Sequence, residues 1–175
     1  MRRNKTFKSV KFICFAALIA ALYVALTYLA MSLGLDKYAV QIRFSEALII
    51  LAFMTPAAIP GLYIGCLLAN ILTGCAPLDI AIGPLATLIG ALGAYLLGKM
   101  GNRRLTRWFC TIPNILANTV IVPIVIYICY TDASENALAV IPFYALTVAL
   151  GEIISSGVLG TVVLICGERQ MRRIL

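Results

Sequence analysis

Five long apolar blocks dominate this chain, and their lengths are close to what a membrane crossing requires. A helix needs about 20 residues to cross a hydrocarbon core roughly 30 Å thick. Of the 175 residues, 62% are hydrophobic and 12% are charged, whereas soluble domains carry about 25% charged residues. The sequence therefore predicts an all-α, polytopic membrane protein and excludes a soluble globule. The blocks cover approximately residues 10–33, 47–72, 78–97, 112–130 and 137–166.

The prolines of the second block decide how many times the chain crosses. Pro56 and Pro60 either kink one helix or separate two short ones. With two short helices, all but Lys37 and Arg43 of the 14 Lys and Arg residues fall on one side of the membrane. Because Lys and Arg accumulate in short cytoplasmic loops, we expect six spans with both termini cytoplasmic, in a single integral membrane domain of residues 1–175. The expected spans are approximately 10–33, 45–58, 60–73, 78–98, 112–130 and 137–166.

The composition also excludes several functions. The chain has no histidine, so histidine-ligated haem and zinc sites cannot form. It has no G-x-x-x-x-G-K-[ST] motif, so ATP-driven work would need a partner. Six scattered cysteines without a C-x-x-C pair indicate neither a disulfide framework nor a metal site. We therefore expect no enzyme activity, cofactor or metal, and we assign the net charge of +7 to topology and lipid contact rather than to nucleic acid.

Three acidic residues at or within the spans are the candidates for function, because a carboxylate at bilayer depth is costly unless it faces a cavity or a partner. Glu46 and Asp79 open the second and fourth spans, and Glu152 lies near the middle of the sixth. Arg43 lies three residues before Glu46 and could pair with it, while Asp79 could instead cap its helix. The excess of acid favours a ligand that is cationic or rich in N–H donors.

Amides and aromatic residues in the same half of the bundle complete the expected site. Asn70 and Asn118 could support the acids, and Phe44, Phe143 or Tyr144 could stack on a ring. The substrate-binding candidates are Arg43, Phe44, Glu46, Asn70, Asp79, Asn118, Tyr144 and Glu152.

Small residues form stripes on the first helix. Alanines four apart share a face, which lets another helix approach closely. They either pack within the bundle or form a docking surface for a partner subunit, because the same spacing serves both. For Gly61 and Gly65 in the third span, internal packing is the better interpretation. The alanines concerned are Ala16, Ala17, Ala20, Ala21 and Ala25.

Four motifs together resemble the QueT family: Gln41-Ile-Arg-Phe-Ser-Glu-Ala-Leu48, Thr55-Pro-Ala-Ala-Ile-Pro-Gly61, Gly65-Cys-Leu-Leu-Ala-Asn70 and Asp79-Ile-Ala-Ile-Gly83. These proteins are substrate-binding S components of energy-coupling factor (ECF) transporters for queuosine precursors. The resemblance implies six helices in a bacterial plasma membrane, an outward-facing pocket, and a complex with a transmembrane coupling protein and two cytosolic ATPases. It also implies that the alanine stripe contacts the coupling protein.

The implied ligand agrees with the acids. A 7-deazaguanine presents an N–H and an exocyclic amine side by side, which one carboxylate can accept together. In preQ1 a primary ammonium adds a charge for a second carboxylate, whereas preQ0 and queuine remain open as ligands. We expect Glu46, Asp79 and Glu152 to bind the ligand, with Asn70 supporting them and Arg43 orienting Glu46.

Other functions remain open at this point. The chain could be an S component for another base or vitamin, or an autonomous secondary transporter coupled to protons through Glu152 and Asp79. An intramembrane enzyme lacks the His/Cys or Ser/His pair it would need. A non-binding assembly subunit would leave three buried acids unexplained.

Overall fold

The computed structural model describes residues 2–35, 42–100, 103–131 and 135–174. All regular secondary structure in these ranges is helical, which confirms the predicted all-α class. Lys37 and Gln41, which entered the topology and motif arguments, lie outside the described residues.

Four helical runs in the described ranges are long and apolar enough to cross a membrane. They are α1 (Arg2–Ser32), α4 (Pro77–Lys99), the run of α5 (Arg103–Phe109) and α6 (Ile112–Tyr130), and the run of α7 (Ala137–Glu152), η2 (Ile153–Leu159) and α8 (Gly160–Ile174). The last run is one continuous helix whose η2 segment is π-helical. Two shorter apolar runs lie between α1 and α4. They are η1 (Phe44–Ile49), a 3₁₀ segment continued by α2 (Ile50–Met54), and α3 (Ala58–Leu72).

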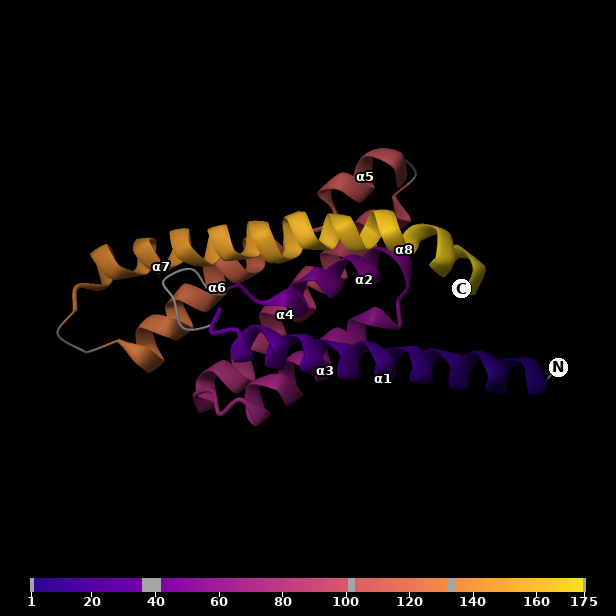
Figure 1. Cartoon of the computed structure of the whole chain (residues 1–175), viewed down its shortest axis with the longest axis horizontal. Coiled ribbons are helices and arrows are strands. Elements are labelled where there is room, and N and C mark those ends of the chain that lie inside the picture. Colours follow the sequence, from indigo (N-terminus) through magenta and orange to yellow (C-terminus); the bar gives the residue numbers. More distant parts are fainter. Residues whose placement is uncertain (1, 36–41, 101–102, 132–134, 175) are drawn as a thin grey trace.

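The proline-rich block forms two short helices, so the predicted number of six helical runs is confirmed. Thr55 precedes Pro56 and has extended backbone angles, the conformation that a following proline favours. Pro60 lies in the first turn of α3, where its missing N–H breaks no helical hydrogen bond. The chain therefore reverses direction between α2 and α3 (Figure 1).

The connections divide between the two ends of the bundle. Both termini and α5 lie toward one end in Figure 1, whereas the α3–α4 and α6–α7 connections lie toward the other.

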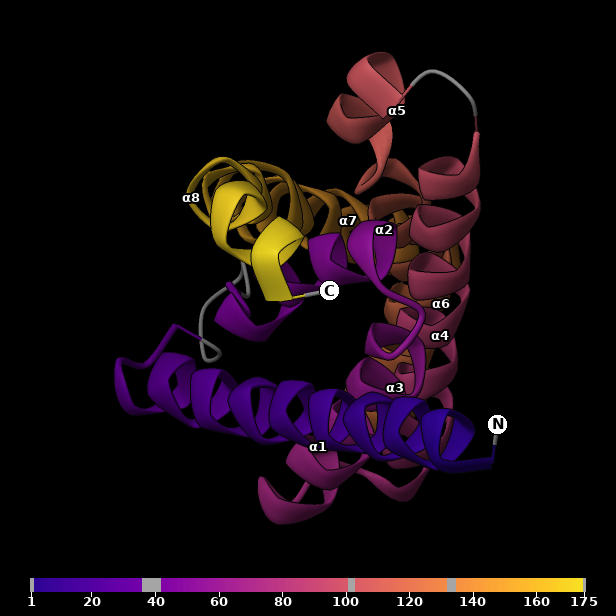
Figure 2. The same ribbon diagram turned by 90° about the vertical axis from the view of Figure 1, so that its right-hand side faces the viewer.

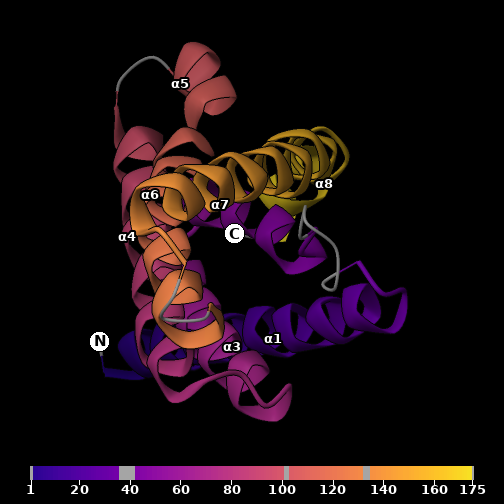
Figure 3. The ribbon, with the colours of Figure 1, turned by 90° about the vertical axis from the view of Figure 1, so that its left-hand side faces the viewer.

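The core is built around η1 and α2, which lie in the middle of the bundle when it is viewed from either end (Figures 2 and 3). Every residue from Leu48 to Phe53 is buried, as expected for a helix that is hydrophobic on all sides. Tyr23, Leu62 and Ala91 pack into the same core from α1, α3 and α4. The long helices instead expose many large apolar side chains, including Leu22, Ile89, Leu116 and Leu146. This outward apolar surface matches a lipid environment.

The alanines of α1 divide into two faces. Glycine lets α3 approach the first face closely: a Cβ at Gly65 would lie 2.7 Å from Tyr23 Cβ and 3.1 Å from Ala20 Cα, and a Cβ at Gly61 would lie 2.7 Å from the Ala16 carbonyl oxygen. The expected internal packing of these glycines is confirmed. The second face, with Ala17, Ala21 and Ala25, is exposed.

Candidate functional site

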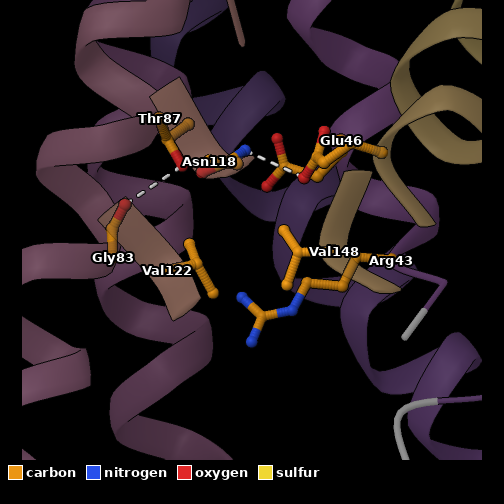
Figure 4. Close-up of a pocket in the computed structure, with 8 residues that line it drawn as sticks. Arg43, Glu46, Gly83, Thr87, Asn118, Val122 and Val148 are labelled. Carbon is orange, nitrogen blue, oxygen red and sulfur yellow. Dashed lines mark hydrogen bonds between the residues drawn. The ribbon is translucent and has the colours of Figure 1, made fainter. Parts of the chain in front are cut away.

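A small cavity lies where η1, α4, α6 and α7 meet, and we call it the acid cavity (Figure 4). Its volume is about 30 Å³. Glu46, Asn118 and Glu152 line it and are buried, although all three are polar or charged. Burying such groups is unfavourable unless they have partners. The remaining lining residues are Arg43, Gly83, Thr87, Val122 and Val148.

One amide group bridges two carboxylates beside this cavity. Asn114 Nδ2 donates to Glu46 Oε2 at 3.1 Å and to Glu152 Oε2 at 3.0 Å. Asn118 Nδ2 donates to the other oxygen of Glu152 at 2.8 Å. The two acids come from sequence positions 106 residues apart, yet each lies one hydrogen bond from the same nitrogen. Because adjacent like charges repel, the pair favours a cation nearby.

The close approach of α4 and α6 positions the bridging amide. A Cβ at Gly90 of α4 would lie 2.7 Å from Asn114 Cα, so a larger residue would push α6 away. Asn114 is fully buried, and its Oδ1 atom has no hydrogen-bond partner. Gly90 thus lets Asn114 reach the two acids.

Contacts from α1 and η2 fix the positions of Glu46 and of its neighbours Arg43 and Ser45. Tyr23 of α1 donates its hydroxyl hydrogen to Glu46 Oε1. Thr27 Oγ1 donates to Ser45 Oγ at 3.0 Å, and the backbone N–H of Arg43 donates to Ser155 Oγ at 3.1 Å. Glu46 also lies in the first turn of η1, where free backbone N–H groups favour negative charge.

Arg43 occupies a different position from the one expected. Its guanidinium extends toward Val122 rather than toward the Glu46 carboxylate (Figure 4). Tyr23 and Asn114, rather than Arg43, orient Glu46 in this structure.

Asp79 and Asn70 lie just behind the cavity wall. Asn70 Nδ2 donates to the backbone oxygen of Asp79 at 3.2 Å. A Cβ at Gly83, which lines the cavity, would lie 2.8 Å from Asn70 Nδ2 and 3.2 Å from Asp79 Oδ1. Asp79 is in the first turn of α4, so its charge also suits the helix dipole.

The expected aromatic residues do not line the acid cavity. Phe44 is half-buried in η1, while Phe143 and Tyr144 line a second, separate cavity near the start of α7. The acid cavity is walled instead by Val122 and Val148.

Sequence reasoning missed three residues that the structure brings to the acids: Tyr23, Thr87 and Asn114. Asn114 could have been found, because it precedes Asn118 by four residues and therefore shares its helical face. Thr87 follows Gly83 by the same spacing. Tyr23 carried no such signal. Within the described residues, no group of three or more Cys, Asp or Glu side chains could hold a metal ion.

Comparison with known families identifies the chain. A family model described as QueT transporter matches residues 13–169. The chain belongs to the QueT transporter family. The match includes every residue that lines the acid cavity in this QueT protein and the part of its six-run bundle from residue 13 to residue 169. No curated protein and no solved structure matches the chain. It is therefore a transporter with membrane helices, in agreement with the predicted family.

Proposed function

We propose that this QueT transporter is the substrate-binding component of an ECF importer that captures a queuosine precursor, a 7-deazaguanine such as preQ1, preQ0 or queuine, from outside the cell. The observation that carries the proposal is the pair of buried carboxylates, Glu46 and Glu152, which the Asn114 amide bridges. Such a pair accepts hydrogen bonds and attracts positive charge.

The pair matches two parts of one ligand. One carboxylate accepts the ring N–H and the exocyclic amine side by side, and the second faces the primary ammonium of preQ1. Asn118 holds Glu152 in place, since it donates to Glu152 Oε1 at 2.8 Å. Asp79 and Asn70 act behind the wall, where the Asn70 amide donates to the Asp79 backbone oxygen.

Binding requires the acid cavity to open. A volume of about 30 Å³ holds about one water molecule, so a two-ring ligand enters only when side chains move. Arg43 is the candidate for this movement, because its guanidinium stands in the cavity as a cation (Figure 4). When the Arg43 side chain rotates out of the cavity, its positive charge leaves the two acids. A cationic ligand would then supply a positive charge in its place.

The topology proposed for this function is six transmembrane helices in one domain of the bacterial plasma membrane, with both termini cytoplasmic. Both termini and α5 lie at one end of the bundle, and that end carries most of the Lys and Arg residues. The positive-inside rule assigns it to the cytoplasm. The α3–α4 and α6–α7 connections then face outside.

Energy for uptake would come from partners, since the chain has no P-loop motif. We assign docking of the transmembrane coupling protein, which connects to two cytosolic ATPases, to the exposed alanine face of α1. Ala17, Ala21 and Ala25 lie there at intervals of four residues, and small residues at this spacing let a partner helix approach closely. Ala16 and Ala20 face α3 instead.

Calorimetry on the purified chain in detergent tests the substrate assignment. We expect preQ1 to bind, and we expect Glu152→Gln to weaken binding at least about tenfold, because removing one partner of a buried charge pair costs about 2 kcal/mol or more. Lys99→Gln, a charge removal at the far end of α4, is the matched control and should change nothing. Absence of binding to preQ1, preQ0 and queuine alike would refute the assignment.

A further inference from the structure

A second cavity, which we call the aromatic cavity, lies between the end of α6 and the start of α7. Its volume is about 560 Å³, which falls in the range of small-molecule sites and far exceeds that of the acid cavity. Three aromatic side chains and one carboxylate are part of its lining. The lining residues used below are Tyr130, Thr131, Glu135, Val140, Phe143 and Tyr144.

Hydrogen bonds hold several of these walls in place. Thr131 Oγ1 donates to the Tyr144 hydroxyl at 3.2 Å, and the Tyr130 hydroxyl accepts from the backbone N–H of Ala76 at 2.8 Å. The backbone oxygen of Glu135 accepts from the Tyr127 hydroxyl at 3.0 Å. The rings of Phe143 and Tyr144 lie 6.0 Å apart at 54°. These contacts fix the positions of Tyr130, Thr131 and Tyr144 in the wall.

The chemistry of these walls suits a flat ring that carries positive charge. Aromatic faces attract cations and stack on planar rings. Glu135 adds an exposed carboxylate, which would attract an ammonium group.

Helix register places the aromatic cavity directly above the acid cavity. On α7, Tyr144 lines the aromatic cavity, whereas Val148 and Glu152 line the acid cavity at successive intervals of four residues. On α6, Tyr130 and Val122 have the corresponding positions, two such intervals apart. Residues four apart lie on one face and are separated by about 6 Å along the helix. The same two helix faces thus wall both cavities.

We propose that the aromatic cavity is an entry subsite that binds a planar, cationic ligand before the ligand moves one to two helical turns to the acid cavity. This proposal rests on the proposed function for the identity of the ligand. The competing explanation is that these tyrosines only anchor the protein at the membrane interface, as aromatic residues often do.

A fluorescent reporter separates the two explanations. Trp108 is the single tryptophan, and both Trp108 and Phe143 are exposed, so the double variant Trp108→Phe, Phe143→Trp moves the only indole into the aromatic cavity. PreQ1 is the probe, and the Glu152→Gln change disables the acid cavity in the same protein. We expect saturable quenching of the indole that persists with Glu152→Gln.

Further substitutions test the assigned chemistry. Glu135→Gln should raise the half-saturating preQ1 concentration about three- to fivefold, in line with an exposed charge pair, and Tyr144→Leu should raise it further. Thermal unfolding of each variant checks that it is folded. Quenching that does not saturate, or that neither substitution changes, would indicate partition into the interface and would overturn the proposal.

Calorimetry on the reporter protein distinguishes this proposal from the proposed function. Tight calorimetric binding of preQ1 by the reporter protein with Glu152 intact, together with no indole quenching after Glu152→Gln, would leave the substrate assignment intact and overturn the entry subsite. Saturable quenching that depends on Glu135, together with no tight calorimetric binding when Glu152 is intact, would support the entry subsite and refute the substrate assignment.

Discussion

Replacing Asn114 with alanine should destabilise the protein more than any other single amide replacement in the bundle. Its Nδ2 group donates to Glu46 at 3.1 Å and to Glu152 at 3.0 Å, and the residue is fully buried. A hydrogen bond to a charged group contributes about 1.5–3 kcal/mol. Losing two of them should lower the free energy of unfolding by about 3–6 kcal/mol, and the two acids would then repel each other without a shared donor.

Two other amides supply a graded comparison. Asn118→Ala removes one hydrogen bond to Glu152, so we expect a loss of about 1.5–3 kcal/mol. Asn136 caps α7 at an exposed position, where its side chain accepts from the Leu138 N–H at 3.0 Å, and Asn136→Ala should cost about 1 kcal/mol. The expected order of destabilisation is therefore Asn114, then Asn118, then Asn136.

The buried thiols offer the assay. Cys66 and Cys110 are buried and free, whereas the other four cysteines are at least partly exposed. Once those four are replaced by serine, a thiol-reactive dye reports the exposure of Cys66 and Cys110 as detergent-solubilised protein is heated. A loss of 3 kcal/mol should lower the midpoint by about 6–12 °C, on the scale of soluble domains of similar size. In a Glu152→Gln background, Asn114→Ala should lower the free energy of unfolding by less, because one of the two charges is gone. Equal midpoints for Asn114→Ala and Asn136→Ala would refute the reasoning.

Three further results are expected. Gly90→Ala should lower the free energy of unfolding by about 1–3 kcal/mol through overpacking against Asn114. Gly157→Ala, whose Cβ would meet one atom at 4.0 Å, should be neutral or stabilising by up to about 1 kcal/mol. Thermal unfolding measures both variants, and the reverse order would count against the close α4–α6 contact. Ala21→Trp should abolish co-purification with the coupling protein while calorimetric preQ1 binding stays unchanged. Ala20→Trp should instead lower the midpoint of thermal unfolding. Retained co-purification with Ala21→Trp would refute the assigned docking face. The purified chain in liposomes should not accumulate preQ1 without its ATPase partners, and concentrative uptake by the chain alone would favour a secondary transporter.

The helices were the most predictable part of this protein. Apolar length and the prolines of the second block predict six runs, because the cost of leaving backbone groups unpaired in lipid allows little besides helices. The pairing of acids was less predictable. Their place within apolar spans marked Glu46 and Glu152 as unusual. Their common partner, Asn114, reaches them only because Gly90 lets α4 and α6 approach closely.

Side-chain direction caused the errors. Three residues separate Arg43 from Glu46, a spacing that favours pairing on a regular helix, yet Arg43 precedes the first turn of η1 and has an extended backbone. Its side chain therefore leaves the segment in another direction. Tyr144 lies two helical turns from Glu152, too far along α7 to share the acid cavity, although both belong to the same helix face.

The hydrogen bond from Tyr23 to Glu46 gives α1 an influence beyond packing. Tyr23 lies on the inner side of a helix whose opposite side carries Ala17, Ala21 and Ala25. A ligand that competes with Tyr23 for the Glu46 carboxylate therefore acts on α1, the helix that a partner would contact from outside. Thermodynamic linkage then requires reciprocity: if loading the site changes the affinity of α1 for its partner by some factor, the partner must change the affinity for the ligand by that same factor. An occupied transporter and an empty one would thus be distinguishable from the lipid-facing side of α1.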